Sequence, residues 1–284
     1  MNEISIAIPY HGDRLKWTTQ TVYNCHGQSF VKEIVLTVEP SDFPIDKVRK
    51  AFRNYKKVKV FQNDKQLFVF RNKINAVQKC NCQHVALLDS DSIVGAAYFG
   101  MIIRKPYSKH VIYCPEYGYP QLNYRQFTGE DINLNAAVDC LGNKNFDKLI
   151  NTMNYVFHRE TWLNALSEAI NSDYEQMAAD SAYMNYHCLK NGMVLRVVQG
   201  MTYRHTIHDQ STYCLHHKEG EQEYSKLIKL MKGERDEISD STKEVCTRGT
   251  YQMPQVSDWS GAGGSGSAVV HKAEDRNAAD LLTD

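Results

Sequence analysis

Two aspartates separated by one small residue follow a short segment of strand-like sequence. Residues 84–88 are mostly apolar and have the length of a buried strand, and Asp89, Ser90 and Asp91 come directly after them. In open α/β sheets, ligands bind just beyond the carboxyl ends of the strands. Carboxylates placed there can hold Mg²⁺ or Mn²⁺, which take oxygen ligands and bridge phosphate oxygens. An acidic turn after a strand gives the same pattern, so the pair indicates a metal site only together with its neighbours.

The segments before this pair alternate between strand and helix patterns. Strands are expected at 4–9, 33–38, 58–61 and 84–88, with helices at 14–23, 45–55 and 68–79. This order predicts an α/β fold with a mostly parallel, Rossmann-like sheet and helices on both of its faces. After Asp91 we expect further strands at 111–114, 153–158 and 194–198, and helices at 159–170 and 174–190. A parallel sheet would place the carboxylates at the same edge as the ends of the earlier strands.

Composition narrows the class of protein. The chain has 284 residues, and its 33 Lys and Arg balance its 33 Asp and Glu, so the whole chain has no net charge to attract nucleic acid or an anionic membrane. Eight cysteines without a C-x-x-C pair indicate reduced thiols and predict a cytoplasmic location. The sequence shows neither a signal peptide nor an apolar stretch long enough to span a bilayer.

Changes in composition divide the chain into three parts. Residues 1–215 hold the alternating pattern and are expected to form one α/β domain. Residues 216–258 are highly charged and predict a C-terminal, partly helical extension. Residues 259–284 begin with a Gly/Ser-rich run and are expected to be a flexible linker and a disordered tail, because such a short polar segment buries no core.

Four segments occur in an order that is more specific than any one of them. They are residues 4–10 (ISIAIPY), 70–75 (FRNKIN, after Asn63-Asp64), 87–91 (LLDSD) and 154–160 (NYVFHRE). Over residues 3–212 this series resembles the family-two nucleotide-sugar glycosyltransferases of the GT-A fold. The resemblance implies a nucleotide-sugar donor, a divalent cation and transfer of a sugar to a hydroxyl group.

The resemblance also implies the positions of the donor and the cation. Residues expected to bind the donor are Pro9, Tyr10, Glu39, Arg71, Asn72, Asp89 and Ser90. A Mn²⁺ or Mg²⁺ ion is expected on Asp91, with Asp89 on the ion or on the ribose. Two histidines, His205 and His208, are both candidates to complete the metal shell, and the sequence does not choose between them. The cation would neutralise the charge of the diphosphate leaving group.

An inverting enzyme also needs a carboxylate to take the proton of the acceptor hydroxyl. Asp180 fits the family position for this base, although Ala179 replaces the carboxylate that usually precedes it, with Asp173 and Glu175 as nearby substitutes. The rival base is the Glu130-Asp131 pair. The acceptor could be a glycan, a protein, a lipid-linked sugar or a modified nucleobase.

Two other functions are compatible with such a sheet. A nucleotidyltransferase would usually carry a Gly-rich, basic loop after the first strand, whereas residues 9–14 (PYHGDR) contain a single glycine. A non-catalytic nucleotide- or sugar-binding module would keep the fold without turnover, and the missing carboxylate before Asp180 is the feature that favours it.

Overall fold

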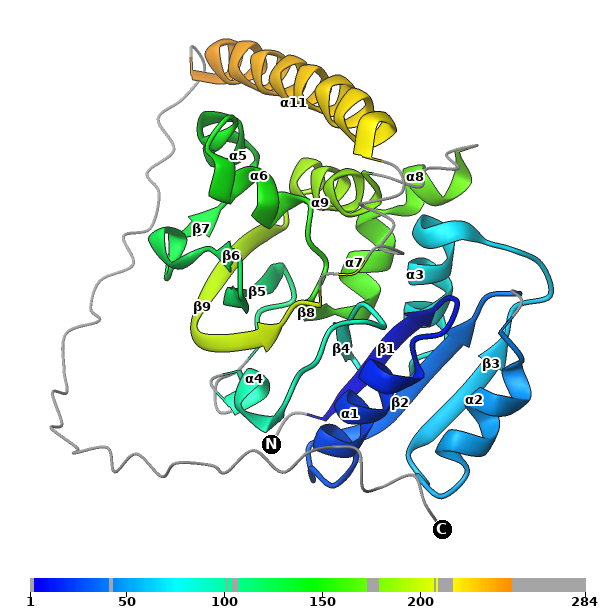
Figure 1. Cartoon of the computed structure of the whole chain (residues 1–284). Coiled ribbons are helices and arrows are strands. Elements are labelled where there is room, and N and C mark those ends of the chain that lie inside the picture. Colours follow the sequence, from blue (N-terminus) through cyan, green and yellow to red (C-terminus); the bar gives the residue numbers. More distant parts are fainter. Residues whose placement is uncertain are drawn as a thin grey trace, which may run out of the picture. The chain divides into compact units, whose positions relative to one another are not determined.

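The computed structural model describes residues 3–40, 43–100, 102–103, 107–172, 179–206, 208 and 217–246. Within them, nine strands form one sheet in the order β3-β2-β1-β4-β8-β5-β9-β7, and β6 pairs with β5 (Figure 1). The strands are β1 (Ile4–Tyr10), β2 (Val31–Val38), β3 (Val58–Gln62), β4 (His84–Leu87), β5 (Val111–Tyr119), β6 (Leu122–Asn123), β7 (Asp131–Ile132), β8 (Tyr155–His158) and β9 (Val194–Arg204).

The direction of the strands confirms the predicted, mostly parallel α/β sheet. Strands β3, β2, β1 and β4 are parallel neighbours, and β5 and β9 run in the same direction as they do. Strands β6, β7 and β8 run the opposite way. Because β8 is inserted antiparallel between β4 and β5, its first residues lie at the edge where β4 ends.

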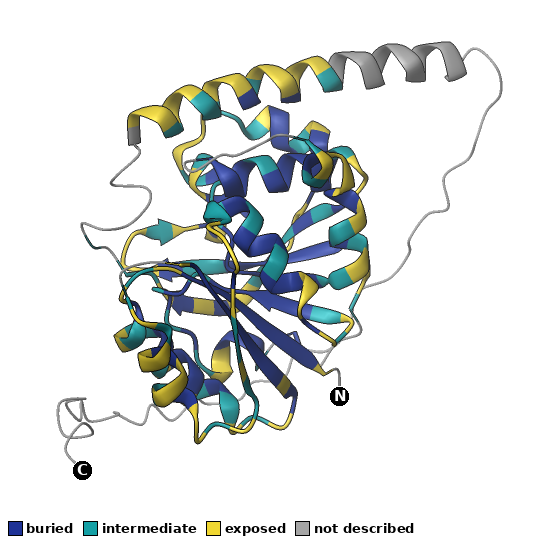
Figure 2. Cartoon of the chain, turned by 90° about the vertical axis from the view of Figure 1, so that its right-hand side faces the viewer, coloured by how far each residue is buried: buried dark blue, intermediate teal, exposed yellow. Residues whose placement is uncertain are grey.

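Helices cover both faces of the sheet, and each face has its own apolar core. The first core contains residues of α1 (Leu15–His26), α2 (Ile45–Phe52) and α4 (Ala96–Gly100). The second contains residues of α3 (Phe68–Gln78), α5 (Leu134–Cys140), α6 (Lys144–Ile150), α7 (Arg159–Ala165), α8 (Ser167–Asn171), α9 (Asp180–Lys190) and α11 (His217–Cys246). Strand side chains alternate between the two cores: Ile6 and Ile8 face the first and Ala7 the second. The central strands β1, β2, β4 and β8 are accordingly buried from both sides over most of their length (Figure 2).

Local sequence explains several boundaries. The side chains of Asn133, Asn143 and His158 accept backbone N–H bonds at the starts of α5, α6 and α7, and so begin those helices. The predicted helix at 159–170 is instead two short helices that meet at Leu166. Strands β5 and β9 are longer than predicted because they pair with each other almost to their ends, past a register shift near Gly200, whose φ is +77°.

Helix α11 occupies part of the charged segment 216–258. Its Leu227 and Met231 are buried in the second core, and Tyr224 donates a hydrogen bond to Asp147 at 2.8 Å. Residues 1–243 therefore form one compact unit. The predicted linker and tail lie outside the described residues. Among the described residues, no helix has the length and apolar character required to cross a bilayer.

Glu33 organises the amino edge of the sheet, opposite the edge that carries the aspartates. Its carboxylate accepts hydrogen bonds from the Ser5 hydroxyl at 2.7 Å and from the backbone N–H of Asn81 at 2.6 Å, and it pairs with Lys59 at 2.6 Å. Burial by itself would raise the pKa of this carboxyl, but the bonds from Lys59, Asn81 and Ser5 outweigh burial and lower it.

We expect Glu33→Ala to reduce the free energy of unfolding by about 1–3 kcal/mol, because the fully buried Ser5 hydroxyl loses its acceptor. A carboxyl with a lowered pKa stabilises the fold above its ordinary value of 4.5, so the deficit should shrink as the pH falls below that value. Urea unfolding measures both effects. The control is Glu3→Ala, which removes an exposed pair with Lys32. Equal losses for the two variants would contradict the assigned role of Glu33.

Candidate functional site

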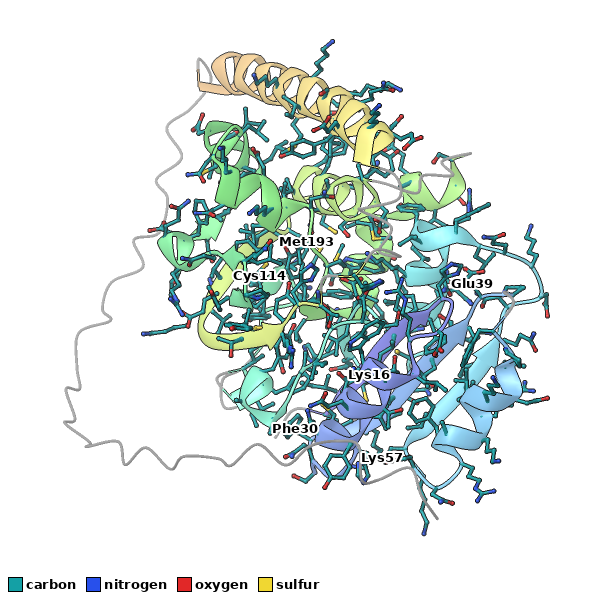
Figure 3. All side chains as sticks on the ribbon, in the orientation of Figure 1. Lys16, Phe30, Glu39, Lys57, Cys114 and Met193 are labelled. Atoms are coloured by element: carbon teal, nitrogen blue, oxygen red, sulfur yellow. The ribbon has the colours of Figure 1, made fainter. Side chains whose placement is uncertain are left out.

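The site lies at the carboxyl edge of the parallel strands. Figure 3 shows Glu39, just after β2, at the opposite end of that strand from Phe30 and Lys57. Asp89 follows β4, and His205 follows β9. Asn154 precedes the antiparallel β8 and therefore reaches the same edge. The topology brings together residues from four separate regions of the sequence.

Asp89 is held between β8 and α3. It exchanges two hydrogen bonds with Asn154: its backbone N–H donates to Oδ1 of Asn154 at 3.0 Å, and its Oδ2 accepts from Nδ2 at 3.1 Å. Its Oδ1 lies 3.4 Å from the ammonium of Lys73. Burial raises the pKa of the Asp89 carboxyl, and the positive charge of Lys73 only partly opposes this. Both oxygens of Asp89 therefore have protein partners.

Lys73 also binds the candidate base. Its Nζ lies 2.8 Å from Oδ2 of Asp180 and donates to the Ser181 hydroxyl at 2.9 Å. The side chains of Lys73 and Asp180 are 5% and 11% exposed, so water screens this ion pair poorly. Burial alone would lower the pKa of the Lys73 ammonium, but Asp180 and Asp89 more than compensate and raise it. One charged ammonium thus lies between Asp89 and the candidate base Asp180.

Asp91 belongs to a second cluster, formed with α1 and the segment after β9. Its Oδ2 accepts a hydrogen bond from Nη1 of Arg14 and lies 2.9 Å from Nε2 of His208. The same Arg14 nitrogen contacts Nε2 of His208. The ring of His208 stacks on Trp17, with 4.9 Å between centroids. All three members of the Arg14–Asp91–His208 cluster are largely buried.

The two candidate histidines are placed differently. His208 contacts Asp91, whereas His205 donates its backbone N–H to the carbonyl of Tyr119 at 2.8 Å. Among the described residues, the buried Nδ1 of His205 has no hydrogen-bond partner. The end of β9 approaches the aspartate loop because Arg204 and Ile93 exchange two backbone hydrogen bonds of 2.9 Å.

Polar side chains of α1 hold the loop that contains Ser90. Thr18 donates to the carbonyl of Ser90 at 2.8 Å, Thr21 to that of Ser92 at 2.9 Å and Asn24 to that of Val94 at 3.0 Å. Positions 18, 21 and 24 share one face of a helix, so a single face of α1 fixes the backbone that follows the aspartates.

The predicted residues nearer β1 and β2 are mostly engaged with the protein. Pro9 and Tyr10 are in β1, and the Tyr10 hydroxyl accepts the N–H of Arg14 at 3.1 Å; burial raises the pKa of Tyr10 to about 12. Glu39 accepts the N–H of Leu67 at 2.9 Å on Oε2. Among the described residues, its buried Oε1 has no hydrogen-bond partner, and burial raises the pKa of this carboxyl.

Arg71 and Asn72, at the start of α3, donate to backbone carbonyls. Asn72 donates to Thr37 at 3.1 Å and so ties α3 to β2. Arg71 donates to Ile170 at 3.4 Å and to Ser172 at 2.7 Å. Both side chains thus link elements that border the site.

The rival base lies elsewhere. Asp131, in β7, forms a bidentate pair with Arg196 near the start of β9, with both N–O distances at 2.5 Å. His208, by contrast, comes after the end of β9 and contacts Asp91. The Glu130-Asp131 pair is therefore separate from the two clusters around the aspartates. The possible substitutes Asp173 and Glu175 lie outside the described residues.

Three residues that contact the aspartates were not singled out from the sequence: Arg14, Lys73 and Asn154. Lys73 and Asn154 lie inside the segments FRNKIN and NYVFHRE, so their place in these motifs was the sequence feature that could have identified them. Arg14 follows the first strand within PYHGDR, a basic position that a charged ligand could use.

Two of the predicted metal ligands, Asp91 and His208, lie together, and their oxygen and nitrogen atoms are of types that a divalent cation accepts. The described residues contain no group of three His, Cys, Asp or Glu that could hold a metal by themselves. Asp91 and His208 do offer one carboxylate oxygen and one imidazole nitrogen 2.9 Å apart. Mg²⁺ is usually held by one or two carboxylates together with substrate phosphates, and Mn²⁺ accepts the same oxygen ligands as well as imidazole.

The structure is similar to crystal structures of Staphylococcus aureus TarS, a GT-A-type glycosyltransferase. For TarS 1–349 in complex with UDP, the TM-score is 0.55 at 15% identity, covering 81% of this chain and 65% of that chain. For the complex with UDP-GlcNAc, it is 0.54 at 16% identity, covering 74% and 60%. The similarity thus spans less than two thirds of TarS 1–349. The sequence matches no protein-family model and no curated protein. This chain has the GT-A glycosyltransferase-like fold.

We expect Lys73→Met to lower the free energy of unfolding by about 3–5 kcal/mol, because Asp89 and Asp180 lose the ammonium that they share. The double variant Lys73→Met/Asp180→Asn should recover part of this loss, since it removes one of the two unpaired charges. Urea unfolding of the variants measures the coupling. Lys32→Met, on an exposed lysine, is the matched control. If the loss in the free energy of unfolding of the double variant equalled the sum of the losses in Lys73→Met and Asp180→Asn, the two residues would not be coupled. That result would contradict the ion pair between them.

Proposed function

We propose that this protein is a metal-dependent glycosyltransferase that moves a sugar from a nucleoside diphosphate donor to a hydroxyl acceptor, with inversion. The observation that carries the proposal is the joint placement of Asp89, Asp91 and His208 at the carboxyl edge of a sheet similar to that of TarS, whose crystal structures include complexes with UDP and UDP-GlcNAc. Sugar nucleotides have the two phosphates that such an edge can bind with a cation.

The charges at the site support the need for a cation. Three carboxylates, those of Asp89, Asp91 and Asp180, are in contact with two positive groups, Lys73 and Arg14. A diphosphate would add further negative charge to a cluster that already has one more anion than cations. Asp91 and His208 are the residues that would hold Mn²⁺ or Mg²⁺. When bound, the cation would neutralise charge on the diphosphate leaving group.

Asp180 is proposed as the base. In the transfer, its carboxylate takes the proton of the acceptor hydroxyl while the acceptor oxygen bonds to the anomeric carbon. The bond from that carbon to the diphosphate oxygen breaks on the opposite face, which inverts the centre. The ammonium of Lys73 holds Asp180 in position, and the Ser181 hydroxyl donates to Oδ2 of Asp180 at 3.5 Å. A glycan, a protein, a lipid-linked sugar and a modified nucleobase all offer such a hydroxyl.

The remaining predictions fit the same proposal. Glu39 has a free buried acceptor atom among the described residues and is proposed to bind the donor from the end of β2. Free thiols at six described cysteines support a reducing, cytoplasmic location. A binding module without turnover is the second candidate, favoured by Ala179 in place of a second carboxylate.

The decisive experiment is Asp91→Asn. We expect it to abolish both turnover and the Mn²⁺-dependent part of UDP affinity, because both depend on one carboxylate. Hydrolysis of a panel of nucleotide sugars measures turnover, and calorimetry with UDP, with and without Mn²⁺, measures binding. Asp46→Asn, on an exposed aspartate, is the control. Tight Mn²⁺-dependent binding of UDP without turnover of any donor in the wild type would support the binding module instead.

Asp180→Asn separates catalysis from binding. We expect kcat to fall by a factor on the order of a hundred or more, with little change in the Kd for UDP, because the base contacts the acceptor and not the nucleotide. Asp131→Asn is the matched variant at the rival position. If kcat fell in Asp131→Asn and was retained in Asp180→Asn, the assignment of the base would be wrong.

A further inference from the structure

The guanidinium of Arg14 occupies the place that a cation on Asp91 and His208 would need. One nitrogen, Nη1, contacts both Oδ2 of Asp91 and Nε2 of His208. These are the two atoms that would coordinate a metal. Two further contacts support this position: Nε of Arg14 donates to the carbonyl of His11 at 3.3 Å, and the guanidinium lies 5.8 Å from the ring centre of Trp17.

A divalent cation and this guanidinium exclude each other. The side chain of Arg14 is only 8% exposed, and arginine does not lose its charge by deprotonation in proteins. A metal held by the same oxygen and nitrogen would therefore meet a positive charge in a poorly solvated place, where like charges repel strongly. The Asp91 oxygen has lone pairs for a metal, and Nε2 of His208 has one in the tautomer that carries its hydrogen on Nδ1. Both atoms contact the Arg14 guanidinium.

A diphosphate changes this balance. Phosphate oxygens offer a guanidinium planar, bidentate partners, which are among the strongest that arginine finds. They also offer a divalent cation the additional oxygen ligands that Asp91 and His208 cannot supply. A bound diphosphate thus offers oxygen partners to the Arg14 guanidinium and to the divalent cation at the same time.

We propose that Arg14 is a built-in competitor of the divalent cation, which holds Asp91 and His208 in the donor-free protein and releases them when a nucleoside diphosphate binds. This inference rests on the proposed function, because it assumes a diphosphate donor and a metal on these residues. Its consequence is reciprocal coupling: Mn²⁺ binds weakly alone and tightly with the nucleotide, and the nucleotide binds tightly only with Mn²⁺.

Calorimetric titration of the full chain with Mn²⁺ in the absence of nucleotide tests the competition. We expect Arg14→Gln to tighten Mn²⁺ binding by a factor on the order of ten, and to reduce the further gain that UDP brings. Lys16→Gln is the matched control, since it removes the same charge from an exposed position on the same helix. It should leave the Mn²⁺ affinity close to that of the wild type.

The Arg14→Lys variant tests whether altered packing, and not the lost charge, changes the affinity for Mn²⁺. It keeps a positive charge at this position, so its Mn²⁺ affinity should remain below that of Arg14→Gln. Unchanged or weaker Mn²⁺ binding in Arg14→Gln would overturn the proposal, as would equal tightening in Arg14→Lys and Arg14→Gln. If the variants give either of these results while the wild type binds UDP in the presence of Mn²⁺, the competition by Arg14 is wrong and the proposed function still stands. If UDP does not bind with or without Mn²⁺, the proposed function fails with it.

Discussion

Three carboxylates share two buried, positively charged side chains at the carboxyl edge of the sheet, and the rest of the site depends on this balance of charge. Lys73 lies between Asp89 and Asp180, and Arg14 lies between Asp91 and His208. Each cation joins an element from one part of the chain to an element from another. Removing either would leave carboxylates with poor access to water, a costly situation in a protein interior.

The sheet provides this arrangement through one reversal of strand direction. Parallel strands β1, β2 and β4 end at one edge, and the antiparallel β8 begins there, which places Asn154 against Asp89. The long pairing of β5 with β9 extends toward the same edge, and His208, after the end of β9, contacts Asp91. The face of α1 that carries Thr18, Thr21 and Asn24 then fixes the loop between the aspartates and α4.

The two clusters hold different parts of the site. The Arg14–Asp91–His208 cluster joins the residues that follow β1, β4 and β9. The Lys73 cluster joins Asp89 to Asp180, the proposed base. Arg71 and Asn72 hold the surrounding backbone, so the protein's own hydrogen bonds organise the site. Preorganisation of this kind lowers the cost of arranging charged groups around a substrate.

Periodicity and turn residues in the sequence determined the order of strands and helices in the first hundred residues, because buried parallel strands and amphipathic helices leave a local pattern. The same local patterns placed Asp89 and Asp91 just after a strand, but they put Asp180 inside a helix expected at 174–190, whereas α9 begins at Asp180. They could not determine the direction of β8, the partners of Arg71, or the choice between His205 and His208. Those depend on contacts between residues far apart in the chain: Arg14 and His208 are 194 positions apart, and Lys73 and Ser181 are 108. Only the folded sheet decides which side chains are in contact. The order and direction of the strands, and not the spacing along the sequence, bring Lys73 and Arg14 to their carboxylates.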